Sequence, residues 1–293
     1  MFSKSISSVL LTSLFAVAGA ASAAAPATAT PLTLDVFNPG EAAIFPVASV
    51  LVAGKHDAVL IDAQFSRAEA QKLVEKIRAS GKKLTTVYIS HSDPDFYFGL
   101  DVIKAAFPQA KIVATPETVA EIRRKADAKL AYWGPILKDN APHAIVIPQA
   151  LTGQRITLEG RSLDISGPTP SRTYVWIPSI KAVVGGVVLF GNLHVWTADT
   201  QSAQSRQDWL KTLDGIAALK PVTVVPGHFK VATPMTPDSI GFTRDYLLTF
   251  EAETAKAANS KALIDAMKQH YPTLGLDGAL ETSAKVAKGE MQW

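Results

Sequence analysis

A pattern of strand, helix and strand in the first third of the chain limits the possible folds. Two apolar runs, 47–52 and 58–61, flank a Gly-Lys-His-Asp turn and predict a hairpin. Residues 66–81 combine a capping-box spacing, one apolar face and a terminal glycine, so they predict a helix. A buried strand over 84–90 then delivers His91 to its carboxyl end. In layered α/β folds, the loops at that end of the strands form the usual ligand site.

The rest of the chain repeats this alternation. Strand-like runs lie at 111–115, 143–147, 154–158, 161–166, 173–178, 181–190 and 221–228. Helical patterns lie at 99–107, from Pro116 onward with Thr115 as the cap, at 205–220 and at 238–259. Two strand-rich halves, each followed by helices, predict a two-layered sheet core flanked by helices, which is an α/β fold class.

The composition limits both the architecture and the chemistry. With 293 residues, 47% of them hydrophobic and 19% charged, the chain can bury the core of one large domain. It contains no cysteine, so any metal must be held by His, Asp, Glu or solvent. The formal charge is +3, and Lys and Arg are spread among acids rather than clustered, so the sequence predicts no nucleic-acid partner and either a small-molecule partner or none.

The N-terminal residues have the pattern of an export signal. Lys4 precedes an apolar run over 9–20 and a small-residue site that ends at Ala23. This predicts a signal peptide over 1–23, followed by a flexible Ala/Thr/Pro-rich lead-in over 24–31, and a periplasmic or secreted protein. A membrane anchor is the alternative, but the run is shorter than the ~20 apolar residues that a spanning helix needs. The remaining residues, 32–293, are expected to form one domain that ends in a helical segment.

The stretch "ISHSDPDFYFGLD" contains the most informative side chains. His91 follows a predicted strand, and Asp93 and Asp95 come at spacings of two. Two other histidines also follow strand-like runs: His194 in "GNLHVW" and His228 in "PGH". Metal sites in strand-and-loop folds draw their ligands from separate loop tips of this kind.

Five landmarks together resemble the metallo-β-lactamase-fold hydrolases in order and approximate spacing. They are "VLIDAQFS", "YISHSDPDFYFGL", "GPTPSRTYVWIP", "VVGGVVLFGNLHVWTADT" and "VVPGHF". The resemblance covers nearly all of the chain after the predicted signal peptide, up to about Phe250. The resemblance implies a four-layered αβ/βα sandwich with a metal site in a cleft along one edge. It is a resemblance to a diverged member, because the metal motif is degenerate.

The family motif is His-x-His-x-Asp-His, and this chain departs from it in two places. By the resemblance, His91 and Asp95 keep their ligand positions, whereas Asp93 replaces the second histidine and Phe96 replaces the last. Phe96 is therefore expected to close the second metal position.

Three further ligand positions lie downstream in the family. A histidine in a Gly-His-Thr turn corresponds to Pro168, and a bridging aspartate falls where this chain has Gly185 and Gly186. The final ligand is kept as His228. Two zinc ions normally draw on six or seven side chains in the family, so the resemblance does not support a binuclear site.

The residues that remain are sufficient for at most one metal ion. His91, Asp93, Asp95 and His228 provide four mixed nitrogen and oxygen ligands, for Zn²⁺ first and for Mn²⁺ or Fe²⁺ as alternatives. A single metal can activate a water molecule, with Asp93 or Asp95 as the catalytic base. The other interpretation is that no metal binds and that "HSDPDF" is a turn, which Asp and Pro favour for local reasons.

Four other residues are candidates for supporting roles. By the resemblance, Asp62 orients the loop that bears the first ligands. His194 is either a substrate contact or a buried histidine that is hydrogen-bonded to the backbone. Tyr97 and Trp196 form either an apolar pocket wall or part of the core.

Two functional hypotheses follow. The first is an exported hydrolase with an altered, at most mononuclear site that acts on a small ester or lactone. The second is a catalytically inactive member of the family that serves as a periplasmic binding or accessory protein. If both carboxylates of the motif point at both histidines, a metal can be accommodated, whereas splayed carboxylates favour the second hypothesis.

Overall fold

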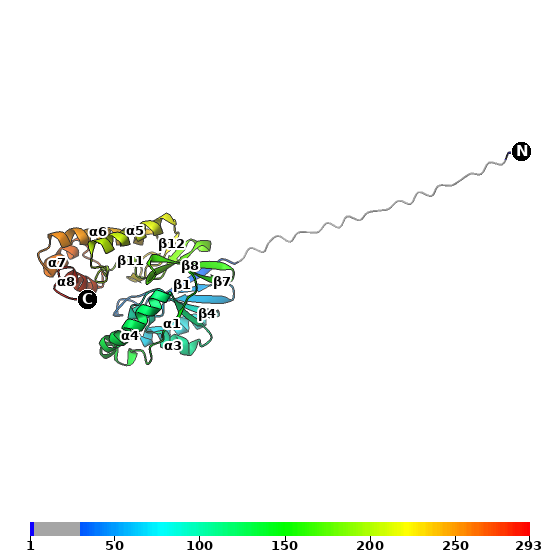
Figure 1. Cartoon of the computed structure of the whole chain (residues 1–293), viewed down its shortest axis with the longest axis horizontal. Coiled ribbons are helices and arrows are strands. Elements are labelled where there is room, and N and C mark those ends of the chain that lie inside the picture. Colours follow the sequence, from blue (N-terminus) through cyan, green and yellow to red (C-terminus); the bar gives the residue numbers. More distant parts are fainter. Residues whose placement is uncertain (3–29) are drawn as a thin grey trace.

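The computed structural model describes residues 1–2 and 30–293 (Figure 1). The expected signal peptide and most of the expected lead-in therefore lie outside the described residues. Within the described part, no helix combines the length and the apolar character that are needed to cross a membrane.

Two sheets form the centre of the molecule. The larger one contains, in spatial order, β1 (Thr33–Phe37), β2 (Ser49–Ala53), β3 (Asp57–Ile61), β4 (Lys83–Ile89), β5 (Lys111–Ala114) and β6 (Gln149–Ala150). The second contains β12 (Thr223–Val224), β10 (Ala182–Val184), β9 (Arg172–Ile177), β8 (Arg161–Thr169) and β7 (Arg155–Leu158). A short parallel pair, β11 (Phe190–Gly191) and β13 (His228–Phe229), lies beside them.

Helices cover the outer faces of both sheets (Figure 1). On the side of the larger sheet lie α1 (Arg67–Ala79), α3 (Leu100–Ala106) and α4 (Pro116–Leu137). A single helical turn, α2 (Pro94–Tyr97), precedes α3 in the chain. The other side carries α5 (Ala203–Ala218) and α6 (Asp238–Lys256), with α7 (Ser260–His270) and α8 (Asp277–Ala287) at one end. Two 3₁₀ turns, Lys138–Asn140 and Pro178–Ile180, complete the set. This arrangement confirms the predicted αβ/βα sandwich.

The inner faces of the two sheets share one hydrophobic cluster. Val50 and Ile61 from the larger sheet belong to the same buried cluster as Ile165 and Val175 from the smaller one. Alternate residues of a strand point to opposite faces, so Leu163 and Ile165 are buried while their neighbours in β8 are half-exposed. Each fully buried aliphatic side chain contributes about 1.5–3 kcal/mol relative to an exposed one.

Local sequence signals placed most of these elements correctly. In α1, the Ser66 side chain accepts the backbone N–H of Glu69, and the Glu69 carboxylate accepts the N–H of Ser66, so the capping box is confirmed. The Thr115 side chain caps α4 as expected by accepting the N–H of Thr118.

Three predicted strands differ from the structure. Residues 143–147 form no strand, because Pro142 and Pro148 flank them and proline has no N–H to give to a sheet. The run over 181–190 is interrupted after β10, where Gly185 and Gly186 adopt left-handed φ angles of 76° and 80°. The run over 221–228 is likewise divided between β12 and β13.

A buried carboxylate joins the strand ends that carry the site. Asp62 directly follows β3, and its Oδ1 accepts the backbone N–H of Ser90 at 2.8 Å. The Ser90 Oγ accepts the N–H of Gly186 at 2.9 Å, so its own proton is free to be donated to Asp62 Oδ2 at 2.7 Å. The ends of β3, β4 and β10 are therefore connected, and both sheets take part. Because Ser90 precedes His91, this network also sets where the motif begins.

The ionisation of Asp62 should make stability depend on pH. Complete burial raises the pKa of this carboxyl from its ordinary value of 3.8 to about 7, although the Ser90 hydrogen bonds act in the opposite direction. A raised folded-state pKa means that the native state holds a proton that the unfolded chain releases. This contribution to stability is complete below the unfolded pKa and is lost as the pH rises through the folded pKa.

We therefore expect the free energy of unfolding to fall between pH 4 and pH 8 by up to about 4 kcal/mol more in the wild type than in Asp62→Asn. Urea unfolding at a series of pH values measures this difference. Asp35→Asn, at a half-exposed position, is the control and should follow the wild type. Parallel curves for the wild type and Asp62→Asn would contradict the expectation.

Candidate functional site

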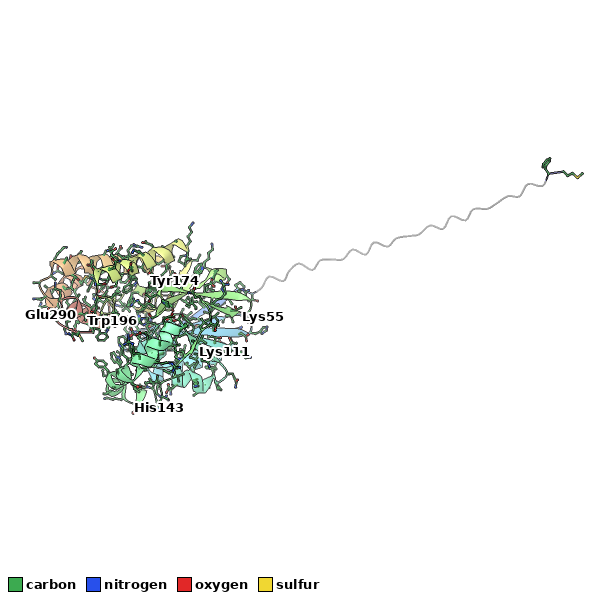
Figure 2. All side chains as sticks on the ribbon, in the orientation of Figure 1. Lys55, Lys111, His143, Tyr174, Trp196 and Glu290 are labelled. Carbon is green, nitrogen blue, oxygen red and sulfur yellow. The ribbon has the colours of Figure 1, made fainter. Side chains whose placement is uncertain are left out.

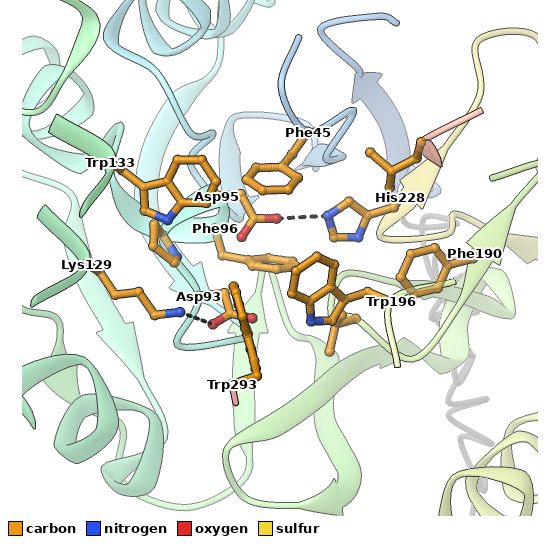
Figure 3. Close-up of a pocket in the computed structure, with 13 residues that line it drawn as sticks. Phe45, Asp93, Asp95, Phe96, Lys129, Trp133, Phe190, Trp196, His228 and Trp293 are labelled. Carbon is orange, nitrogen blue, oxygen red and sulfur yellow. Dashed lines mark hydrogen bonds and ion pairs between the residues drawn. The ribbon is translucent and has the colours of Figure 1, made fainter. Parts of the chain in front are cut away.

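A narrow cleft opens where the strand ends of both sheets meet the C-terminal helices. Its volume is about 50 Å³. Trp196, which lines it, lies where the two helical layers approach each other (Figure 2). The lining residues are Phe45, Asp93, Pro94, Asp95, Phe96, Lys129, Trp133, Val187, Phe190, Trp196, His228, Leu276 and Trp293. Most of them are apolar, with acidic and basic groups from separate segments (Figure 3).

One pair of polar groups in the cleft is formed by Asp95 and His228. Asp95 lies in the single turn of α2, His228 begins β13, and both side chains are buried. His228 Nε2 is 2.8 Å from Asp95 Oδ2 (Figure 3). The imidazole also stacks on Phe190, with the ring centroids 5.2 Å apart. Its Nδ1 is buried and has no hydrogen-bond partner within the described chain.

The other pair is formed by His91 and Asp93. His91 Nδ1 accepts the backbone N–H of Asp93 at 3.2 Å and is 3.4 Å from the Asp93 carboxylate. Burial, followed by the nearby Arg172 guanidinium, lowers the pKa of His91 to about 3, so the ring is neutral and carries its proton on Nε2. Burial, followed by the charge of Asp95, raises the pKa of Asp93. Lys129 Nζ approaches Asp93 Oδ1 at 3.8 Å (Figure 3).

Phe96 separates the two pairs. Its ring centroid is 5.4 Å from that of His91 and 5.6 Å from that of His228, with edge-on geometry to both. The phenyl ring is 1% exposed and packs against both imidazoles. His91 itself is not among the residues that line the cleft. The carboxylates are consequently splayed, with Asp95 directed to His228 and Asp93 directed to His91 and Lys129.

This geometry does not fit a metal ion. A protein metal site needs at least three or four donor atoms that converge on one point. Nowhere in residues 30–293 do three or more His, Cys, Asp or Glu side chains form such a group. The four expected ligands lie near one another, but they are engaged as two pairs on either side of a phenyl ring.

Two positions that the resemblance assigned to lost ligands do not face the cleft. Pro168 is exposed and lines a different cavity, together with Thr115 and Gly167. At Gly186, an added Cβ would lie 1.9 Å from the Thr173 carbonyl oxygen, so no side chain fits there. The residue of this turn that does line the cleft is Val187. Histidine at 168 and aspartate at 186 would therefore not restore a metal site.

The residues expected in supporting roles are divided between cleft and core. Trp196 lines the cleft and donates its indole N–H to Asp199 at 2.7 Å. Tyr97 is buried away from the cleft lining. His194 is also outside it, where its Nδ1 is 3.0 Å from the Tyr246 hydroxyl, and burial lowers its pKa to about 4. Asp62 does not line the cleft either, and it supports the motif loop through its hydrogen bonds with Ser90.

Several important residues were not expected from the sequence. Lys129 and Trp133 are four positions apart on α4 and therefore share a helical face, but nothing local shows that this face meets the cleft. Leu276 and Trp293 come from the C-terminal segment, whose role the sequence left open. Arg172 packs over the Trp209 ring at 4.9 Å, and its Nη2 is buried without a partner among the described residues.

Comparison with known proteins identifies the family. The family model described as the metallo-beta-lactamase superfamily matches residues 43–228, which is more than half of the chain. The chain therefore belongs to the metallo-β-lactamase superfamily. No curated protein matches it significantly.

Solved structures show the same fold at low sequence identity. A metallo-beta-lactamase family protein from Thermus thermophilus is 16% identical, with a TM-score of 0.61 over 88% of this chain and 91% of that one. TMB-1 is 18% identical, with a TM-score of 0.50 over 74% of this chain and 97% of that one. The DIM-1 metallo-beta-lactamase is 17% identical, with a TM-score of 0.50 over 75% and 99%. The superfamily consists generally of metal-dependent hydrolases, and at these identities the likeness concerns the fold alone.

The separating ring provides a direct test of the site geometry. Replacing Phe96 with histidine puts a third imidazole between His91 and His228, so we expect Phe96→His to bind Zn²⁺ at least about tenfold more tightly than the wild type. Titration calorimetry measures this change. Phe98→His is the matched control, because Phe98 is similarly buried but stacks on Phe65 outside the cleft. Equal zinc affinity in the wild type and Phe96→His would show that the ring is not what keeps the ligands apart.

Proposed function

We propose that this member of the superfamily is an exported small-molecule binding protein that does not use the family's metal chemistry. The observation that carries the proposal is the position of the Phe96 ring between His91 and His228. It divides the four potential ligands into two pairs: Asp95 Oδ2 is 2.8 Å from His228 Nε2, and His91 Nδ1 accepts the backbone N–H of Asp93. Export is supported by the apolar N-terminal run, which has the pattern of a secretory signal.

The cleft has the features of a ligand pocket. It is concave, its lining is mostly aromatic, and a few polar groups converge on it. Small-molecule sites in proteins generally combine these properties, and they are usually preformed. A binding role requires only this shape and chemistry, whereas the usual reaction of the superfamily requires metal ligands that converge.

One observation favours a second candidate, which is metal-independent hydrolysis of a small ester or lactone. Asp95 and His228 form a buried pair that lines the cleft, with 2.8 Å between Oδ2 and Nε2. A carboxylate and imidazole pair can accept a proton from an attacking water molecule, and this contribution is typically about 10²- to 10⁴-fold in rate. In this case, Asp95 is the candidate for orienting the imidazole or accepting the proton.

Turnover measurements separate the two candidates. We expect p-nitrophenyl acetate and γ-butyrolactone to be hydrolysed no faster by the mature protein than by His228→Ala, with and without added Zn²⁺, Mn²⁺ or Fe²⁺. Thermal unfolding of His228→Ala shows whether the variant is folded.

The other outcomes contradict the binding role in distinguishable ways. Hydrolysis that falls about 100-fold or more in His228→Ala and is insensitive to a chelator would establish the second candidate. Hydrolysis that the chelator removes would establish a metal-dependent hydrolase and would refute the geometric argument.

A further inference from the structure

The wall of the cleft combines aromatic rings with acidic groups. Six rings line it, from Phe45, Phe96, Trp133, Phe190, Trp196 and Trp293. The carboxylates of Asp93 and Asp95 line the same space (Figure 3). Aromatic faces carry partial negative charge, so rings and carboxylates both attract a cation and repel an anion.

A protein cation already occupies part of this environment. The Lys129 ammonium lies 5.2 Å from the centroid of the Trp293 ring and 3.8 Å from Asp93 Oδ1. These two contacts are the ones that a cationic ligand would make in the same place. Arg172 does not line the cleft and packs over Trp209 instead.

The size of the cleft limits the part of the ligand that can enter. The cleft volume of about 50 Å³ admits only a small part of a ligand, such as a compact head group. A second cavity of about 490 Å³ adjoins it and shares Lys129, Trp133 and Trp293 with the cleft. This second cavity, which we call the outer groove, has room for the remainder of a larger molecule.

Trp293 is held at the boundary between the two cavities. Its indole N–H donates to Asp199 Oδ1 at 2.9 Å, and Asp199 Oδ2 accepts the N–H of Trp196 at 2.7 Å. The two indole rings meet edge-on, with their centroids 4.9 Å apart. One carboxylate therefore orients two rings of the cleft wall, and this arrangement prepares their faces for a ligand.

We infer that the cleft binds a small organic cation, with a methylated ammonium head group among Trp196, Trp293 and the two carboxylates, and with the rest of the molecule along the outer groove. This inference rests on the proposed binding role and specifies its ligand class. The ligand displaces the Lys129 ammonium from the Trp293 face. A carboxylate ligand is disfavoured because it would meet Asp93 and Asp95.

Binding of two isosteric probes tests the inference. Choline and 3,3-dimethylbutan-1-ol have the same shape, but only choline is charged. We expect titration calorimetry on the mature protein to show at least about tenfold tighter binding of choline, and tryptophan fluorescence to respond to tetramethylammonium chloride.

Variants locate the binding. Trp293→Leu and Asp93→Asn should each weaken choline binding at least about fivefold, whereas Lys129→Met should strengthen it severalfold by removing the competing ammonium. Lys104→Met is the matched control, because Lys104 is exposed on α3 and lines neither the cleft nor the outer groove. Its affinity for choline should remain within about twofold of the wild type.

Each other outcome overturns the inference. Equal affinity for both probes would make the cleft an ordinary apolar pocket, and binding of neither would exclude this ligand class. If Trp293→Leu and Asp93→Asn leave the affinity for choline unchanged, choline binds outside the cleft. The turnover measurements decide the proposed function separately: choline binding with metal-dependent hydrolysis would refute the binding-only role and leave the cation site in place.

Discussion

The hydrogen bonds around the buried Asp62 carboxylate are the interaction on which the cleft depends. They connect the ends of β3, β4 and β10 through Ser90 and Gly186, and so they join the two sheets at the edge where the cleft opens. A buried carboxylate is costly unless its partners donate to it, and here the Ser90 N–H and hydroxyl both do. The network fixes the start of the motif loop, and the positions of Asp93, Asp95 and Phe96 follow from it.

Given that loop, the side chain at position 96 decides the chemistry. A phenyl ring between two histidines provides no lone pair for a metal, and its bulk keeps the neighbouring carboxylates on separate partners. The His228 imidazole contacts the Asp95 carboxylate, and His91 Nδ1 accepts the backbone N–H of Asp93. The same ring adds an aromatic surface to the cleft wall, beside tryptophans from α4 and the C-terminal segment. Loss of the metal geometry and gain of an aromatic pocket are thus two consequences of one side chain.

Local patterns in the sequence predicted the helices with caps and the main strands, because these features depend on neighbours along the chain, whereas the αβ/βα sandwich was implied by the family resemblance. The capping box at Ser66 is an example. The proximity of His91 and His228 followed from family resemblance. Two features depend on contacts between residues far apart in the sequence, so local patterns could not predict them. They are the clash that forbids a side chain at Gly186 and the position of Trp293 in the same cleft as Asp93. The strand break after β10 was missed because the apolar run around its glycines is continuous in the sequence.

The motif residues do not converge on a single point where a metal could bind. The most direct measurement is elemental analysis of the mature protein, purified without chelator and without a histidine tag and then incubated with Zn²⁺, Mn²⁺ or Fe²⁺, beside a His91→Ala/His228→Ala variant. The geometry predicts that the wild type binds no more metal than the double variant. About one equivalent in the wild type that disappears in the double variant would contradict it, because the two pairs would then have to open into a single site.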